Sequence, residues 1–312
     1  MLRYILFRVA LLIPTVFLMA AVTFVIMQLT PGSPFALGNM DRITPEARAR
    51  IEAKYGLDDP KIVQFGRYLK NSLQGDFGVS YVWRGQDVST IIRRTFPVSL
   101  QLGFMALILA VVVGITLGTL AAVNQNGPID YASMTTAILF YSMPNFVMGF
   151  LLLLLFAVWL PNHGLDLGFA VSGWQSPQDW ILPTIALAAA PLASIARYTR
   201  GCMVEVIRSD YVRTARAKGL AERKVIVKHV LKNALIPVIT IIGPIFAAIG
   251  TGTFFVEQVF NIPGMGKFYV QSMLTKDQPM IMAVVLIYGI FLALMNILVD
   301  IVNAFIDPRI RY

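Results

Sequence analysis

Long apolar runs without charged residues alternate with polar segments along this chain of 312 residues. An α-helix needs roughly 20 mostly apolar residues to cross a bilayer. Six runs approach or exceed that length, and the third is interrupted by Ser-Met-Pro-Asn at 142–145: residues 9–29, 98–123, 131–160, 181–196, 235–255 and 280–306. The pattern predicts an all-α integral membrane protein with six transmembrane helices.

The first run is unlike a signal peptide, whose apolar region of about 7–15 residues ends at a small-residue cleavage site. Residues 9–29 are longer and lead into Leu-Thr-Pro-Gly-Ser-Pro-Phe. We therefore expect a retained membrane helix.

Composition supports a membrane protein. Only 14% of residues are charged, 57% are hydrophobic, and the mean hydropathy is +0.69. The net charge of +9 would suit nucleic acid, but no separate basic soluble domain carries it, so Lys and Arg at membrane faces explain it better. The single cysteine, Cys202, excludes an internal disulfide framework and a multi-cysteine metal site.

The distribution of positive charge predicts the orientation, because short cytoplasmic loops are rich in Lys and Arg. Segment 197–234 has ten basic residues against three acids, whereas 161–180 has none and 256–279 has two. Segment 31–97 also has ten, but it is long and seven acids largely balance them. We expect this segment outside and both termini in the cytoplasm.

The outer segment is expected to fold. Thr44, Pro45 and Gly56 mark the ends of one short helix, and the stretch after Asp59 predicts a second helix followed by a Gly-rich turn. We therefore divide the chain into residues 1–97, a membrane helix with an extracytoplasmic segment, and 98–312, a five-helix core with a cytoplasmic loop at about 197–234.

Catalytic chemistry has little support in the sequence. His163 and His229 are predicted on opposite sides of the membrane, and no HExxH, GxSxG or glycine-rich phosphate motif occurs. Asn296, Asp300 and Asn303 share one face of the last helix, as a polar helix–helix seam or, alternatively, a proton site. We predict no catalytic residue, no metal site and an energy source outside this chain.

The most basic segment, SDYVRTARAKGLAERKVIVKHVLKNALIP at 209–237, predicts two helices. Ser209 is a favourable N-cap with Asp210 in the first turn, and Gly219 can end the helix. A second helix starts near Ala221 and carries a stripe of lysines at 224, 228 and 232, which could face lipid headgroups. The first helix is expected to expose a compact knob that inserts into a groove of another protein, made of Tyr211, Val212, Ala215 and Leu220.

This segment resembles the cytoplasmic coupling loop, or EAA loop, of permease subunits in ATP-binding cassette (ABC) importers. Arg213, Thr214 and Ala215 stand at the Glu-Ala-Ala positions of the family pattern, and Gly219 matches its glycine. Further along, Leu231 conforms, while His229 replaces Ile and Lys232 replaces Pro; these departures are similar to the peptide branch of the family.

Other segments resemble the first membrane subunit of oligopeptide permeases over nearly the whole chain: the N-terminal 35 residues, IEAKYGLDDP, GDFGVSY, FFVEQVFNIPGMGKF and the C-terminal DPRIRY. The resemblance implies a type I ABC importer permease fold in a bacterial or archaeal cell membrane. The implied substrate is a dipeptide or oligopeptide, with nickel, glutathione or another small solute as alternatives.

The resemblance also implies the partners. They are a second, similar permease subunit, two cytoplasmic ATPase subunits that carry ATP and Mg, an extracytoplasmic peptide-binding protein and membrane lipid, but no nucleic acid. This chain itself would bind no cofactor. The rival functions are a channel or carrier without ATPases and an intramembrane enzyme or scaffold.

Two sets of functional residues follow. The residues expected to couple to the ATPase are Asp210, Tyr211, Val212, Thr214, Ala215, Ala217, Gly219 and Leu220. The pore or gate candidates lie at the break in the third run and in the expected sharp turn Asn-Ile-Pro-Gly-Met-Gly-Lys-Phe after the fifth: Met143, Pro144, Asn145, Pro263, Gly264, Met265 and Gly266. The alternatives are an ordinary kink and a surface hairpin, respectively.

Overall fold

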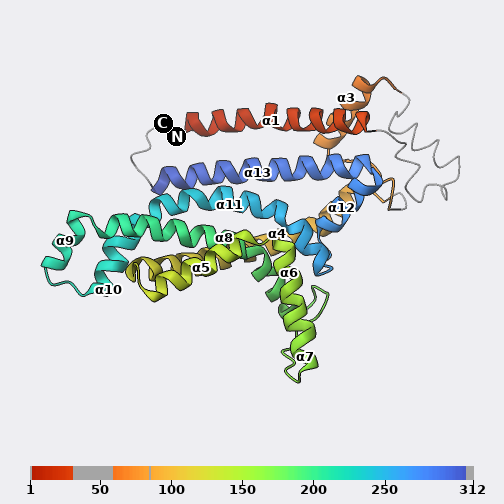
Figure 1. The fold of residues 1–312 in the computed structure, drawn as a ribbon. Coiled ribbons are helices and arrows are strands. Elements are labelled where there is room, and N and C mark those ends of the chain that lie inside the picture. Colours follow the sequence, from red (N-terminus) through yellow and green to blue (C-terminus); the bar gives the residue numbers. More distant parts are fainter. Residues whose placement is uncertain (1, 31–58, 84–85, 307–312) are drawn as a thin grey trace. The chain divides into compact units, whose positions relative to one another are not determined.

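The computed structural model describes residues 2–30, 59–83 and 86–306 (Figure 1). Within these ranges the chain is helical, and the only β pairing there is an isolated antiparallel bridge between Val79 and Asp87. The predicted helix at 44–56 lies outside the described residues. The second predicted outer helix is present as α3, Lys61–Leu73, and the glycines that follow it, Gly75 and Gly78, have φ of 78° and 87°.

Six described helices are long and apolar enough to span a membrane, which confirms the predicted number. They lie at Leu6–Leu29, Val88–Val123, Asn145–Asn162, Pro177–Ile207, Glu222–Phe246 and Gln278–Val302. The long helices, with their full bounds, are α1 (Leu2–Leu29), α4 (Val88–Val123), α8 (Pro177–Ile207), α11 (Lys232–Val259) and α13 (Gln278–Ile306). The shorter helices are described below. The chain is thus an all-α, multi-pass membrane protein.

The third predicted run is broken at residues 142–145, as the sequence indicated, and forms more than one helix. α5 (Pro128–Ser142) ends at the break, and α6 (Asn145–Leu153) begins after it and continues through the π-helix η2 (Leu154–Trp159) into α7 (Leu160–Asn162). Figure 1 shows that α6 and α7 run crosswise to α5. Pro144 explains the break, because its ring fixes φ at −57° and removes a backbone donor.

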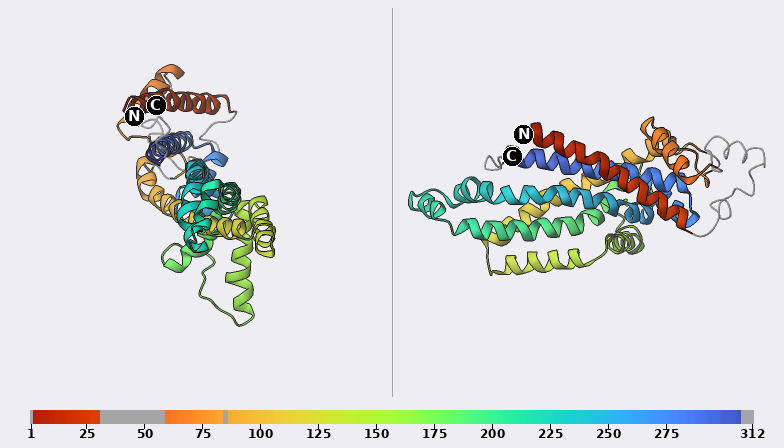
Figure 2. Two further views of the ribbon diagram at one scale, coloured as in Figure 1. Left: turned by 90° about the vertical axis from the view of Figure 1, so that its left-hand side faces the viewer. Right: turned by 90° about the horizontal axis from the view of Figure 1, so that it is seen from above.

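Two compact units make up the chain. Among the described residues, one unit contains 100–262 and 295–306, and the other contains 2–30, 59–83, 86–99 and 263–294. In the first unit α5, α8 and α11 lie side by side, as the views of Figures 1 and 2 agree. Because α4 and α13 are continuous helices, each contributes residues to both units.

Small residues allow α4 to approach α8 closely in the first unit. A Cβ atom built on Gly114 would lie 2.9 Å from the Leu192 carbonyl oxygen, and one built on Gly118 would lie 2.7 Å from Cβ of Thr199. Real Cβ atoms do not make such contacts. Glycine at these two positions therefore sets the distance between the helices.

Aromatic contacts order the second unit. The Phe65 ring of α3 lies 5.7 Å from that of Phe17 and 5.3 Å from that of Phe24, both on α1. A Cβ atom on Gly289 of α13 would collide with the Met19 side chain of α1, so these two helices are in close contact. This unit also contains α12, Met265–Thr275.

Candidate functional site

The predicted coupling helix is present as α9, Asp210–Ala217. Ser209 is at the N-cap position with extended backbone, as expected, but its hydroxyl donates to the Val206 carbonyl oxygen at 2.6 Å and does not cap α9. Asp210 is in the first turn, where its charge suits the helix dipole. The predicted start of the helix is therefore confirmed, but the Ser209 side chain does not form the N-cap hydrogen bond that such a position favours.

Gly219 ends this element as predicted. Its φ is 75°, in the left-handed region that favours glycine, and its N–H donates to the Arg216 carbonyl oxygen at 2.9 Å. No atom lies within 4 Å of where a Cβ would stand. Backbone conformation, not space, therefore requires glycine here.

The expected knob is wrong for two of its four residues. Val212 and Ala215 are only 0% and 6% exposed, and Leu220 is half-buried. They pack inside this chain, in a cluster whose other buried members are Ala122, Met203, Val225, Ile226, Val230 and Ala234. Their physical role is to dock α9 on the chain's own helices, and only Tyr211 of the knob is well exposed.

Two polar links strengthen this docking. Arg216 pairs with Glu222 across the glycine turn, with Nε–Oε2 at 3.1 Å and Nη2–Oε1 at 2.6 Å. Asn233 Nδ2 donates to the Tyr211 hydroxyl at 2.8 Å. These links attach α9 to a continuous helical stretch formed by α10 (Glu222–Lys224), the π-helix η3 (Val225–Leu231) and α11. The sequence contained a signal for this ion pair, since Arg216 and Glu222 carry opposite charges on the two sides of Gly219.

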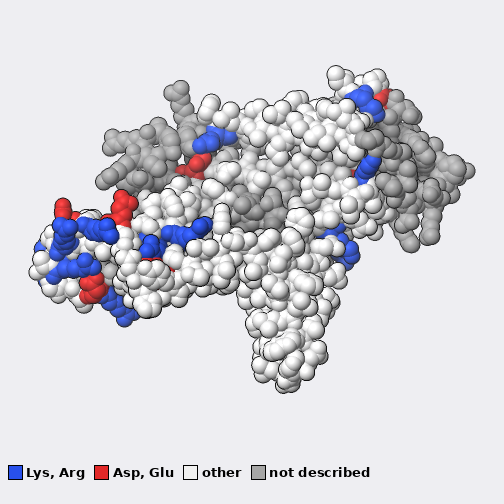
Figure 3. All heavy atoms as spheres, viewed as in Figure 1, with Lys and Arg blue, Asp and Glu red and all other residues white. Residues whose placement is uncertain are grey.

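The solvent-facing side of α9 remains available to a partner. Asp210, Tyr211, Thr214, Ala217 and Gly219 are all exposed. Figure 3 shows Lys and Arg gathered over α9 and α10, with a few acids among them, and Lys224, Lys228 and Lys232 are exposed as predicted. A coupling role for these residues stays a prediction.

A partly buried ion pair joins α5 and α8. Arg200 of α8 binds Asp130 of α5 in a bidentate way, with Nε–Oδ1 at 2.5 Å and Nη2–Oδ2 at 2.6 Å. The Asn126 N–H also donates to Asp130 at 2.9 Å. Sequence reasoning missed this pair, because it counted Arg200 as a loop residue, whereas α8 remains helical to Ile207.

The first set of pore candidates forms the break between α5 and α6. Met143 has extended backbone, Pro144 is the exposed N-cap residue of α6, and Asn145 is its half-buried first residue. The Pro144 carbonyl oxygen accepts from the Met148 N–H at 3.0 Å. Close by, a Cβ atom on Gly149 would lie 3.0 Å from the Phe260 ring, so α6 packs tightly against the end of α11.

The second set lies in the other unit. α11 ends at Val259 and the chain turns through Asn261, which has φ of 50°. Pro263 is exposed and Gly264 is the N-cap residue of α12. The turn is thus confirmed but shorter than expected, because the buried Met265 and Gly266 already belong to α12.

Asp277 is a buried polar centre that sequence reasoning missed. Its carboxylate accepts hydrogen bonds from the Ser80 hydroxyl and from the Tyr81 N–H, the latter at 3.1 Å, and burial raises its pKa. Ser80 Oγ in turn accepts from the Trp83 N–H at 3.0 Å. Asp277 therefore fixes the loop after α3 to the start of α13. An Asp two residues before a proline at a helix start was the available signal.

Comparison with known families gives two matches that together cover most of the chain. Residues 114–312 match the family described as the binding-protein-dependent transport system inner membrane component. Residues 1–103 match the corresponding N-terminal family.

Curated relatives align over full length. The dipeptide transport system permease protein DppB of Bacillus subtilis (strain 168) is 46% identical, over 100% of this chain and 98% of the relative. The oligopeptide transport system permease protein OppB of Escherichia coli (strain K12) is 41% identical, over 100% of each chain. A solved inward-facing structure of the MetNI methionine ABC transporter matches with a TM-score of 0.56 at 17% identity, over 70% of this chain and 96% of that one. This last likeness concerns the fold alone.

Proposed function

The chain belongs to the family of inner-membrane components of binding-protein-dependent transport systems, and we propose that it forms half of the membrane pathway of an ATP-driven dipeptide or oligopeptide importer. Full-length identity of 41–46% to dipeptide and oligopeptide permeases carries the proposal. Because family members are non-catalytic permease subunits, the chain's task is mechanical.

Partners supply what the chain lacks. A permease of this family works with an ATPase and a substrate-binding protein. We propose that the second half of the pathway is a similar but distinct permease subunit and that ATP and Mg bind to two ATPase subunits. The exposed side of α9 would receive the ATPase, and the docked Val212 and Ala215 would pass its movement to α11. The loops around Pro144 and Pro263 are proposed to line or gate the pathway.

The orientation follows the charges. We place α9 and both termini in the cytoplasm, because segment 197–234 has ten Lys and Arg whereas 161–180 has none. Single-cysteine labelling from each side tests this placement once Cys202 is replaced by Ala. Labelling of a cysteine at exposed Thr214 only from the outer side would overturn it.

Reconstitution tests the function. The chain, its neighbouring permease, the ATPases and the binding protein are placed in liposomes, and uptake of labelled dipeptide, oligopeptide, nickel and glutathione is measured. We expect peptide uptake that requires ATP and the binding protein. Preferred uptake of nickel or glutathione would reassign the substrate. Uptake by the chain alone would favour a channel or carrier instead.

A further inference from the structure

Apart from Phe65, which packs on α1, α3 turns several apolar side chains outward and polar side chains inward, the opposite of a surface helix in water. Residues 62, 66, 69 and 73 lie on one face, and Ile62 and Leu73 at its two ends are 85% and 90% exposed. The opposite face, at spacings of three and four residues, carries Gln64, Arg67, Tyr68 and Asn71. An apolar face turned outward is stable in lipid, which indicates that α3 lies in the membrane interface.

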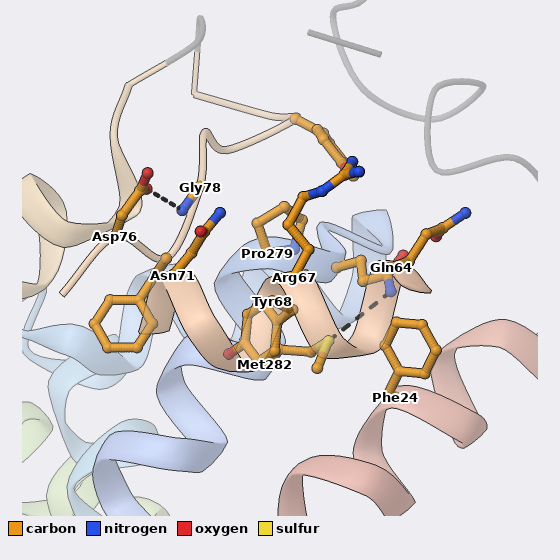
Figure 4. Close-up of a pocket in the computed structure, with 12 residues that line it drawn as sticks. Phe24, Gln64, Arg67, Tyr68, Asn71, Asp76, Gly78, Pro279 and Met282 are labelled. Atoms are coloured by element: carbon orange, nitrogen blue, oxygen red, sulfur yellow. Dashed lines mark hydrogen bonds between the residues drawn. The ribbon is translucent and has the colours of Figure 1, made fainter. Parts of the chain in front are cut away.

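The polar face of α3 lines a small, open hollow with a cavity volume of about 70 Å³. All the lining residues belong to one compact unit. Figure 4 shows Gln64, Arg67 and Asn71 of α3 around it together with Asp76, while Phe24 comes from α1 and Met282 from α13. The hollow therefore combines charged, amide and apolar groups, as a site for an amphiphile requires.

The position of the hollow relative to the bilayer follows from how α1 and α13 are aligned with each other. Met19 contacts Gly289; Met19 is ten residues before the end of α1, and Gly289 is eleven residues after the start of α13. At 1.5 Å per residue, these two helix ends lie level to within about 2 Å. Phe24 and Met282 are then about 6–8 Å inside the ends, near the boundary of acyl chains and headgroups.

The charged groups specify the headgroup. Arg67 pairs with Asp59 at 2.6 Å, but its guanidinium has five donor hydrogens and can also bind a phosphate. One Asp76 oxygen accepts from the Gly78 N–H at 2.9 Å, and a carboxylate has further acceptor sites for an ammonium. The amides of Gln64 and Asn71 can donate to ester oxygens.

We propose that this hollow binds a phospholipid with a primary ammonium headgroup, of the phosphatidylethanolamine type. Arg67 holds the phosphate and Asp76 holds the ammonium, while the buried Phe24 and Met282 form the apolar inner wall of the hollow. A choline headgroup cannot donate a hydrogen bond to Asp76, so it binds less well. The proposal needs only that α1 and α13 cross a bilayer, and it is independent of the transported substrate.

The test uses the assembled importer in nanodiscs with equal amounts of palmitoyl-oleoyl phosphatidylethanolamine and phosphatidylcholine. Native mass spectrometry then counts the phospholipid that the complex retains. We expect phosphatidylethanolamine to be retained preferentially. Arg67→Gln should weaken retention at least about tenfold, as expected for the loss of a charge-assisted hydrogen bond.

Matched variants separate the site from general effects. Lys70→Gln removes the same charge from an exposed position of α3 and should retain lipid like the wild type. Asn71→Leu leaves the Arg67–Asp59 pair intact and should also weaken retention. Equal retention by wild type, Arg67→Gln and Asn71→Leu, or equal retention of both phospholipids, overturns the proposal. A co-purified peptide in place of phospholipid does so too.

Discussion

At the scale of single residues, Gly219 holds a backbone conformation that side chains with a Cβ adopt at a cost of about 1–2 kcal/mol. Asp277 holds a buried carboxylate whose partners come from a loop almost 200 residues earlier. The first residue acts through local geometry and the second through long-range hydrogen bonds. Their tests differ accordingly.

Gly219→Val is expected to reduce partner-stimulated ATP hydrolysis and uptake while membrane insertion persists, because a β-branched residue resists positive φ. Gly219→Asn should retain most activity, because Asn tolerates the left-handed region and no atom lies near the added Cβ. Both activities are measured in proteoliposomes. Normal coupled transport by the Val variant would contradict the coupling assignment.

Asp277→Ala is expected to destabilise the protein by about 3 kcal/mol, because it leaves buried donors of Ser80 and Tyr81 without an acceptor. Thermal unfolding and hydrogen exchange at residues 76–83 would detect the loss. Asp277→Asn keeps one acceptor oxygen and should cost less. No change in exchange in the Ala variant would show that the loop is held by other contacts.

The same residue predicts a pH dependence. Burial raises the folded-state pKa of Asp277 above that of the unfolded chain, so the folded state binds the proton more tightly. Its contribution to stability is full below the unfolded pKa of about 3.9 and declines as pH rises through the folded-state pKa. The stability of wild type relative to Asp277→Asn should therefore rise as pH falls from 7 towards 4, and a constant difference would exclude this linkage.

At the scale of elements, α9 is a short helix that gains its position from packing and not from its own length. Eight residues are far fewer than an isolated helix needs. Val212 and Ala215 supply the apolar docking, and Arg216 and Tyr211 add the polar links. A similar dependence on neighbours holds for α4 and α8, which meet at two glycines.

Val212→Asp should release α9, because a carboxylate without a partner is costly at a fully buried position, by about 3 kcal/mol or more. We expect ATP hydrolysis to lose its link to peptide uptake while the spans still insert. Thr214→Asp places the same charge on the exposed side of α9 and should leave the fold intact. Equal uptake and hydrolysis in wild type and Val212→Asp would argue against the docking role.

Gly118→Ala should destabilise the α4–α8 contact by about 1–3 kcal/mol, because its Cβ would collide with the Ala196 carbonyl group and Thr199. Gly201→Ala adds the same methyl group to α8, where no atom lies within 4 Å, and should be neutral or stabilising by up to about 1 kcal/mol. Unfolding midpoints in detergent compare the two. Equal unfolding midpoints for the two variants would mean that α4 and α8 accommodate the methyl group at position 118 without loss of stability.

At the scale of the whole molecule, the pore candidates are divided between two compact units. Met143, Pro144 and Asn145 belong to one unit, and Pro263 to Gly266 belong to the other. α4 and α13 are common to both units. Under the proposed coupling role, a movement received at α9 would have to act on helices that continue beyond the unit that contains α9.

Asn145→Cys, in a Cys202→Ala background, tests whether the α5–α6 break lines the pathway. We expect labelling by an aqueous reagent that changes between the ATP-bound and nucleotide-free states. Met148→Cys, at a buried position one turn along α6, should resist labelling in both states. If the cysteine at position 145 is never labelled, Asn145 does not line the pathway.

The sequence by itself determined the features that depend on neighbours along the chain. Six spans follow from apolar run length, the α9 boundaries from Ser209 and Gly219, and the broken third span from Pro144. Only the tertiary structure decided the burial of Val212, the pairing of Asp130 with Arg200 and the hydrogen bond from Ser80 to Asp277. It also showed that the polar face of α3 lines a hollow. The physical reason is that backbone preference and membrane length are local quantities, whereas desolvation and ion pairing depend on residues that folding brings together from distant positions.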